Sequence, residues 1–126
     1  MYKEYVLMNK TFSVDVNISQ ISCSCNAALT TVSAPGYNSS WQPDGGSTGA
    51  YYCDANEVTG VWCQEMDLIE ANKYISQTTA HKCDQSPGGY ISNCDRGGCP
   101  TNTWDWWQPG FGPYSWTIDT TKTYRQ

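Results

Sequence analysis

Apolar and polar residues alternate regularly over residues 12–18, near the start of the chain. This period of two predicts a half-buried antiparallel strand. We expect further strands over the segments that are apolar or rich in β-branched residues: 2–8, 26–32, 61–70, 73–78 and 114–121. The sequence shows no convincing helical period of useful length. The pattern therefore predicts an all-β fold, an antiparallel β-sandwich.

Long stretches between the expected strands are typical of loops. Residues 35–49 are rich in Gly, Pro, Ser and Asn, and residues 83–113 are dense in Gly and Cys. The chain has 126 residues, a length that suits one domain with one modest core. We therefore expect a single, loop-rich domain over residues 1–126.

The expected strand 61–70 contains three acids in six positions, Glu65-Met66-Asp67-Leu68-Ile69-Glu70. Neighbouring carboxylates in a low-dielectric site resist ionising together, so this cluster is costly to bury. A pair of carboxylates is the usual machinery of glycosidic bond cleavage. In a regular strand Glu70 points away from Glu65 and Asp67, so a common site requires a β-bulge. Otherwise the acids lie on a half-buried strand and face solvent.

Composition limits the function classes. The net charge is −5, charged residues make up 15% of the chain and aromatic residues 13%. Nucleic acid binding needs clustered Lys and Arg, so nucleic acid is not an expected partner. A neutral polysaccharide suits this surface better. No run of 18 apolar residues occurs, so we expect no membrane-spanning helix. Two-carboxylate chemistry needs no cofactor, and none is expected.

Seven cysteines in a loop-rich chain predict disulfides and an oxidising, extracellular location. A zinc site is not expected, because the spacing in Cys23-Ser24-Cys25 is too tight and the chain has one His. The odd count leaves one thiol without a partner inside the chain. No apolar leader follows Met1, so the sequence looks like a mature region or a piece of a longer protein. Secretion is also favoured by three glycosylation motifs, at Asn9, Asn17 and Asn38.

Several blocks of the sequence resemble, in order, those of glycoside hydrolase family 7, the cellobiohydrolases and endoglucanases. Residues 63–72 resemble the catalytic signature of this family. The other blocks that resemble the family are 10–16, 23–29, 52–54, 81–83, 94–99 and 114–121. Family 16 shares the Glu-x-Asp-x-x-Glu strand but not the cysteine blocks. The resemblance implies a disulfide-stapled, concanavalin-like jelly roll. It also implies a short form or fragment that covers the central region with the catalytic motif.

The resemblance implies a retaining glycoside hydrolase that acts on β-1,4-glucan by double displacement. Glu65 would be the nucleophile, Glu70 the acid/base, and Asp67 would hydrogen-bond the nucleophile. A retaining pair requires carboxyl groups about 5–5.5 Å apart. His81 would lie near the acid/base, and Asn26 and Asp54 would line the catalytic subsites.

The resemblance also implies two disulfides, Cys53 with Cys63 and Cys83 with Cys94. The family counterparts of Cys23 and Cys99 bond residues further downstream, and Cys25 has no recognised counterpart. The pairing of these three cysteines stays open.

Aromatic residues near the end of the chain allow two interpretations. Trp104, Trp106 and Trp107 are either a platform for sugar rings or rings that fill a core or an interface. Trp116 alternates with Ile118 and is expected in the core. The alternative to an enzyme is therefore a non-catalytic extracellular module that binds carbohydrate or assembles into a structure. Exposed strand edges or the unpaired cysteine would then allow self-association.

Overall fold

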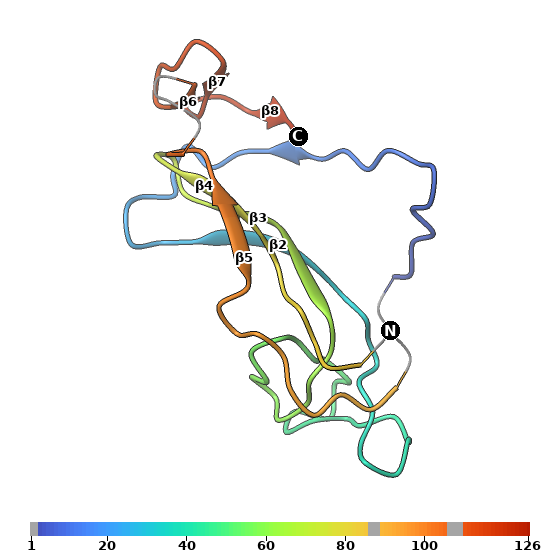
Figure 1. Cartoon of the computed structure of the whole chain (residues 1–126). Helices are drawn as coiled ribbons and strands as arrows, with labels where there is room; N and C mark the ends of the chain where they lie inside the picture. Colours follow the sequence, from blue (N-terminus) through green and yellow to red (C-terminus); the bar gives the residue numbers. More distant parts are fainter. Residues whose placement is uncertain (1–2, 86–88, 106–109) are drawn as a thin grey trace. The chain divides into compact units, whose positions relative to one another are not determined.

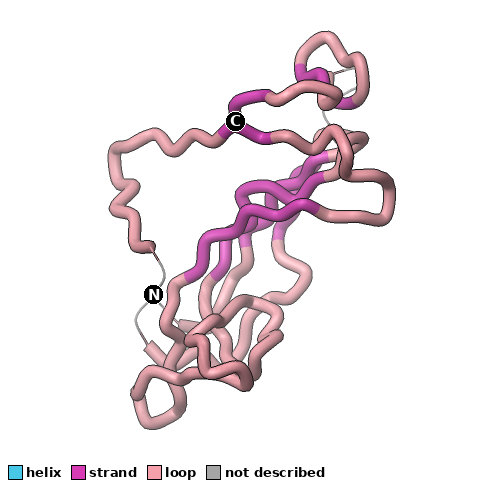
Figure 2. Tube along the Cα trace, turned by 180° about the vertical axis from the view of Figure 1, so that it is seen from behind, coloured by secondary structure: helices cyan, strands magenta, loops and turns pink. Residues whose placement is uncertain are grey.

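The computed structural model describes residues 3–85, 89–105 and 110–126, and it shows strands and loops but no helix among them (Figures 1 and 2). No described segment could cross a membrane as a helix. The chain forms two compact units. The first comprises Met1–Ala27, Ala71–Ser76 and Asn102–Gln126, and the second comprises Ala28–Glu70 and Gln77–Thr101. The prediction of a single domain stays a prediction.

The main sheet has four strands in the order β2-β3-β4-β5, and all but their end residues belong to the second unit (Figure 1). The strands are β2 (Ala27–Val32), β3 (Glu65–Ala71), β4 (Ser76–Ala80) and β5 (Cys99–Asn102). The backbone N–H of Ser33 donates to Gln64 O at 3.0 Å, and that of His81 donates to Glu65 O at 3.2 Å. Residues 72–75 join β3 to β4, a connection short enough only for antiparallel neighbours.

Two small clusters of buried residues lie beside the disulfides in the second unit. Cys53, Val61 and Cys63 form one cluster, and Ala55, Ile91 and Cys94 form the other. The expected disulfides Cys53–Cys63 and Cys83–Cys94 are present, which confirms both. The remaining cysteines are free and exposed: Cys23, Cys25 and Cys99.

The first unit contains two short pairs of strands. β1 (Asp15–Val16) and β8 (Tyr124–Arg125) are antiparallel, while β6 (Phe111–Gly112) and β7 (Ile118–Asp119) are parallel. Arg125 Nε donates to Asp15 Oδ1 at 2.8 Å across the first pair. The buried side chains include Ile18, Phe111 and Thr120.

Several predictions for the first unit are wrong or only partly right, among them the strand expected over 114–121, of which only Ile118–Asp119 is a strand. Residues 3–8 form no strand, and the alternating segment 12–18 forms a strand only at Asp15–Val16, with Ile18 buried and Phe12 exposed. Trp116 is 81% exposed and not in the core. An apolar pattern becomes a strand only where a neighbouring strand supplies hydrogen-bond partners, and alternation alone does not reveal that partner.

The predictions for the main sheet are closer. β2 and β3 lie within the expected strands 26–32 and 61–70, apart from Ala71, and residues 35–49 form no strand. β4 begins three residues later than expected. β5 falls in a segment predicted as loop, because Cys99-Pro100-Thr101-Asn102 has no alternation and includes a proline, which sheets accept at an edge.

Candidate active site

Glu65 begins β3 and is buried, with 9% of its surface exposed. Its Oε2 accepts a hydrogen bond from the backbone N–H of Ala55 at 3.0 Å. Burial raises the pKa of Glu65, and the charges of Asp67 and Asp54 raise it further, while the Ala55 N–H and His81 lower it. The carboxyl group is thus oriented by a backbone donor in a site that resists its ionisation.

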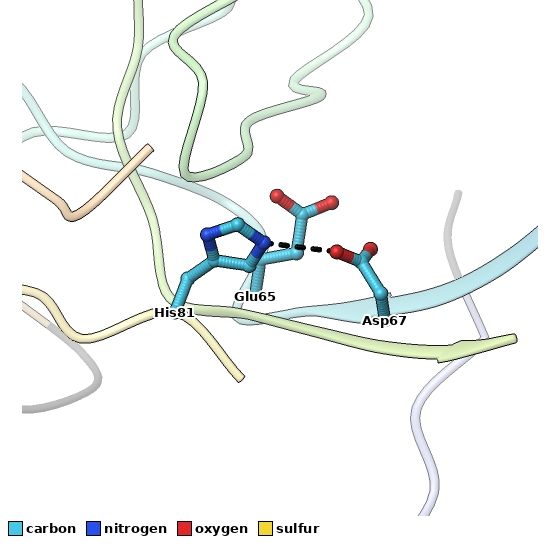
Figure 3. Close-up of side chains that lie close together, drawn as sticks. All are labelled: Glu65, Asp67 and His81. Carbon is cyan, nitrogen blue, oxygen red and sulfur yellow. Dashed lines mark hydrogen bonds and ion pairs between the residues drawn. The ribbon is translucent and has the colours of Figure 1, made fainter. Parts of the chain in front are cut away.

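His81 and Asp67 lie beside Glu65 and form a buried pair (Figure 3). Their side chains are 4% and 8% exposed, and His81 Nε2 lies 2.9 Å from Asp67 Oδ2. The other ring nitrogen, Nδ1, lies 2.7 Å from the backbone oxygen of Asp95. Because a carbonyl oxygen only accepts, Nδ1 must carry a proton.

Burial opposes the charged form of His81, but its neighbours outweigh burial and raise its pKa. The Asp95 carbonyl, the hydrogen bond to Asp67 and the charges of Asp67 and Glu65 all favour the imidazolium. With both ring nitrogens facing acceptors, the pair is an imidazolium donating to a carboxylate.

Gly98 allows the backbone before β5 to pack directly against Thr79 and His81. Its φ is +64°, and a Cβ there would lie 2.5 Å from Thr79 Cγ2 and 3.0 Å from His81 Cε1. Any side chain would therefore displace one of the two residues, and the left-handed conformation also favours glycine.

Glu70 is held by β4. Its Oε2 accepts hydrogen bonds from Thr79 Oγ1 at 3.0 Å and from Gln77 Nε2 at 3.3 Å. Side chains two positions apart share a face of a strand. This face of β4 therefore carries Gln77 and Thr79, and also His81, which directly follows the strand. Glu70 thus lies on the face where His81 meets Asp67, although its spacing from Asp67 is odd.

The hydrogen-bond register explains this placement. Two backbone hydrogen bonds mark the register, one from His81 N–H to Glu65 O and one from Asn72 N–H to Ile75 O. Between them lie seven steps along the chain on the β3 side (65 to 72) but six on the β4 side (75 to 81). One extra residue on β3 is the offset of a β-bulge. This is the irregularity that the sequence requires if the three acids are to share a face.

The other predicted site residues lie in different surroundings. Asp54 is buried, and its Oδ1 accepts from the backbone N–H of Asn56 and of Val58, so it shapes the turn that presents Ala55. Asn26 and Trp104 are exposed residues of the first unit, and Trp106 and Trp107 lie outside the described residues.

The three expected glycosylation positions lie in turns or loops. Asn9 and Asn17 are exposed and Asn38 is partly buried, with the side-chain oxygens of Asn17 and Asn38 accepting local backbone N–H groups.

Sequence reasoning missed the groups that hold the site in place. The Ala55 N–H and the Asp95 carbonyl belong to the backbone, so no residue type marks them. Thr79 was detectable, since it lies two residues before His81 and therefore on the same face.

Two further features adjoin Glu65. Ligand atoms of Glu65, Asp67 and His81 lie within 4.8 Å of one another, so these are the residues that could hold a cation. A cation there would replace the hydrogen bond between His81 and Asp67. A cavity of about 250 Å³ also borders Glu65 and is lined by residues of β2 and of the segment around the start of β3: Thr31, Val32, Ser33, Gln64, Glu65 and Met66.

The fold and this site define an all-β chain with a buried carboxylate–histidine cluster on its main sheet. Residues 1–59 match the sequence profile of "Glycosyl hydrolase family 7". The chain is 32% identical, over 98% of its length, to a probable endo-beta-1,4-glucanase celB of Aspergillus clavatus, and 29% identical, over 96%, to endoglucanase EG-1 of Trichoderma longibrachiatum. Alignment over nearly the whole chain includes the acid motif, which the profile match does not reach.

Solved structures give the same result. Native Humicola insolens endocellulase EGI aligns with 90% of the chain at a TM-score of 0.66 and 25% identity. A family 7 cellobiohydrolase from Daphnia pulex aligns with 90% of it at 0.66 and 21% identity. The predicted fold class and the predicted resemblance are thus confirmed, and this chain is related to glycosyl hydrolase family 7. It spans about a third of the length of these relatives and structures.

Proposed function

We propose that this chain carries the catalytic centre of a retaining glycoside hydrolase that acts on β-1,4-glucan. The observation that carries the proposal is the Glu65 carboxyl group, buried, oriented by the Ala55 N–H and adjacent to the His81–Asp67 pair. A glutamate held in this way, with a second glutamate on the same face of the sheet, has the parts of a double-displacement site.

In the first step the ionised Glu65 attacks the anomeric carbon while Glu70 gives its proton to the departing glycosidic oxygen. A covalent glycosyl ester forms on Glu65 and the bond between the sugars breaks. In the second step Glu70 takes a proton from water, whose oxygen attacks the anomeric carbon of the glycosyl ester, breaks its bond to the Glu65 oxygen and releases Glu65 as a carboxylate. The Ala55 N–H occupies Oε2 of Glu65 and leaves Oε1 for the attack.

The relatives support the choice of substrate. Those of Aspergillus oryzae and A. clavatus are named as an endo-β-1,4-glucanase and a probable one, and one similar structure is endoglucanase I complexed with cellobiose. β-1,4-Glucan is therefore the substrate class we propose. The two disulfides suit an oxidising compartment, which supports an extracellular location.

The second candidate is a non-catalytic extracellular module that binds carbohydrate or assembles with other chains. Trp104, Tyr114 and Trp116 of the first unit are 69%, 86% and 81% exposed, and exposed aromatic rings suit stacking on sugars.

Hydrolysis of soluble glucans separates the two functions. Reducing ends released from carboxymethyl cellulose, barley β-glucan and laminarin are measured for the wild type, for Glu65→Gln and for Glu4→Gln, which changes an exposed acid outside the site. The enzyme predicts cleavage of the β-1,4-linked glucans, lost only in Glu65→Gln. Binding to cellulose without cleavage by any of the three proteins would contradict it and favour the module.

A further inference from the structure

Two backbone groups hold the candidate site, and each belongs to a different loop. The Ala55 N–H, in the loop 54–58, donates to Glu65 at 3.0 Å. The Asp95 carbonyl, in the loop 94–98, faces His81 Nδ1 at 2.7 Å. The orientation of Glu65 and the charge of His81 therefore depend on where these loops lie.

Each loop has local bonds of its own. Asp54 Oδ1 accepts the N–H groups of Asn56 and Val58, and Asp95 Oδ1 accepts that of Gly97 at 3.0 Å. The disulfides end one residue before Asp54 and one before Asp95. These contacts shape each loop, but they do not fix the distance from one loop to the other.

Two contacts join the loops. In the first, Ala55 and Cys94 share an apolar cluster against which Trp62 packs. In the second, Arg96 Nη2 donates to Glu57 Oε2 at 2.9 Å, and the Arg96 guanidinium lies 4.7 Å from the centre of the Trp62 ring. Such stacking on tryptophan is a favourable cation–π arrangement.

We propose that Glu57, Trp62 and Arg96 form a loop clamp that positions the Ala55 N–H on Glu65 and the Asp95 carbonyl on His81. Glu57 is two residues from Ala55, and Arg96 directly follows Asp95, so movement of the ion pair is transmitted through at most two residues. Glu57 and Arg96 are positioning residues, since neither touches the carboxylates. Their relevance to catalysis rests on the proposed function, whereas the clamp itself does not.

The clamp is exposed, which sets the size of its effect. The Arg96 and Glu57 side chains are 57% and 34% exposed, and an ion pair of this kind is screened by salt. Its loss should therefore loosen the loops and leave the chain folded. Burial lowers the His81 pKa, and Asp67, Glu65 and the Asp95 carbonyl raise it; of these three groups, the clamp holds only the Asp95 carbonyl in place.

The test is NMR titration of His81, which is the single histidine of the chain and gives one set of ring signals. Arg96→Met should lower the His81 pKa toward about 6.5 and make exchange of the Ala55 amide hydrogen about two- to five-fold faster. Glu57→Gln, which keeps Arg96 over Trp62, should act in the same direction but less. Arg96→Lys, which keeps the charge, should restore most of both values.

The matched control is Arg125→Met, which removes an exposed arginine from the Asp15 ion pair in the first unit. It should leave the His81 pKa and the Ala55 exchange rate unchanged. The clamp is overturned if Arg96→Met and Glu57→Gln both fold and behave like this control.

The outcome also separates the clamp from the proposed function, because neither signal depends on hydrolysis. Shifted signals in a chain that cleaves no glucan would support the clamp and count against the enzyme. Hydrolysis of glucan by a chain whose signals do not shift in Arg96→Met and Glu57→Gln would support the enzyme and contradict the clamp.

Discussion

His81 and Asp67 show how single residues set the charge of the site. A buried ion pair pays a large desolvation cost, and it persists only when further hydrogen bonds satisfy both partners. Here the Asp95 carbonyl supplies the second acceptor for His81, and Glu65 lies close enough to add its field. The imidazolium in turn lowers the pKa of Glu65, which burial raises. The protonation of His81 and that of Glu65 are therefore coupled.

This coupling predicts that stability falls as pH rises. The pKa of His81 is higher in the folded than in the unfolded chain, so its contribution is complete below about 6.5 and is lost as pH rises through the folded value. The raised pKa of Glu65 acts in the same direction, starting from about 4.5. Asp67→Asn should cost about 1–3 kcal/mol near pH 6 and flatten the fall above it.

Urea unfolding between about pH 5.5 and 9 measures this slope. Asp15→Asn is the control, because the Arg125 hydrogen bond lowers the pKa of Asp15 and confines its effect to more acidic pH. A wild-type stability that stays constant over this range would contradict the imidazolium pair.

At the scale of elements, the hairpin of β3 and β4 determines which acids meet. The extra residue on β3 brings Glu70 to the face of Asp67, and Thr79 then holds its carboxylate. Thr79 is 2% exposed, so its hydroxyl is shielded from water. A buried hydroxyl that loses its acceptor carries a desolvation cost of about 1–3 kcal/mol, so this hydrogen bond holds the Glu70 carboxyl group firmly.

Thr79→Val keeps the shape of the side chain and removes this donor. If Glu70 is the acid/base, the variant should lower kcat about 10- to 100-fold, because the carboxylate loses its orientation. Thr78→Val is the matched control on the same strand, since Thr78 Oγ1 donates to the backbone oxygen of Leu68 and not to an acid. Hydrolysis rates at saturating substrate measure the effect, and equal losses in both variants would contradict the role of Thr79.

The strand with the acids could be predicted because its sequence carries both an apolar pattern and an unusual cluster of charges. The need for a bulge also followed from the odd spacing of Asp67 and Glu70. By contrast, β5 and the short pairs of the first unit depend on contacts with distant segments, which a local pattern does not encode. The same holds for the Ala55 N–H, because any residue except proline supplies a backbone donor.

At the scale of the whole molecule, the disulfides compensate for a small core. Fully buried side chains are few among the described residues, and two of the largest belong to Cys53 and Cys63. The two bridges span 10 and 11 positions of the sequence. Each bridge also ends beside a loop that contacts the site, so it affects both stability and chemistry.

Removing either bridge should lower the free energy of unfolding by about 3 kcal/mol, as expected for loops of this length. The double variants are Cys53→Ala with Cys63→Ala, and Cys83→Ala with Cys94→Ala. Only the variant that lacks the Cys83–Cys94 bridge should also lower the His81 pKa, because Cys94 directly precedes Asp95, whose carbonyl faces His81 Nδ1. Denaturant unfolding and NMR titration measure the two effects, and a His81 pKa that changes equally in both variants would contradict this division.

The most direct test of the central claim is to trap the covalent intermediate. A 2-deoxy-2-fluoro-cellobioside with a good leaving group slows the second step of a retaining enzyme, so the sugar ester accumulates on the nucleophile. Mass spectrometry of the intact chain and of its peptides should show one added cellobiosyl group on Glu65, absent in Glu65→Gln and present in Glu4→Gln. An unmodified chain, or an ester on another residue, would contradict the assignment of Glu65 as the nucleophile.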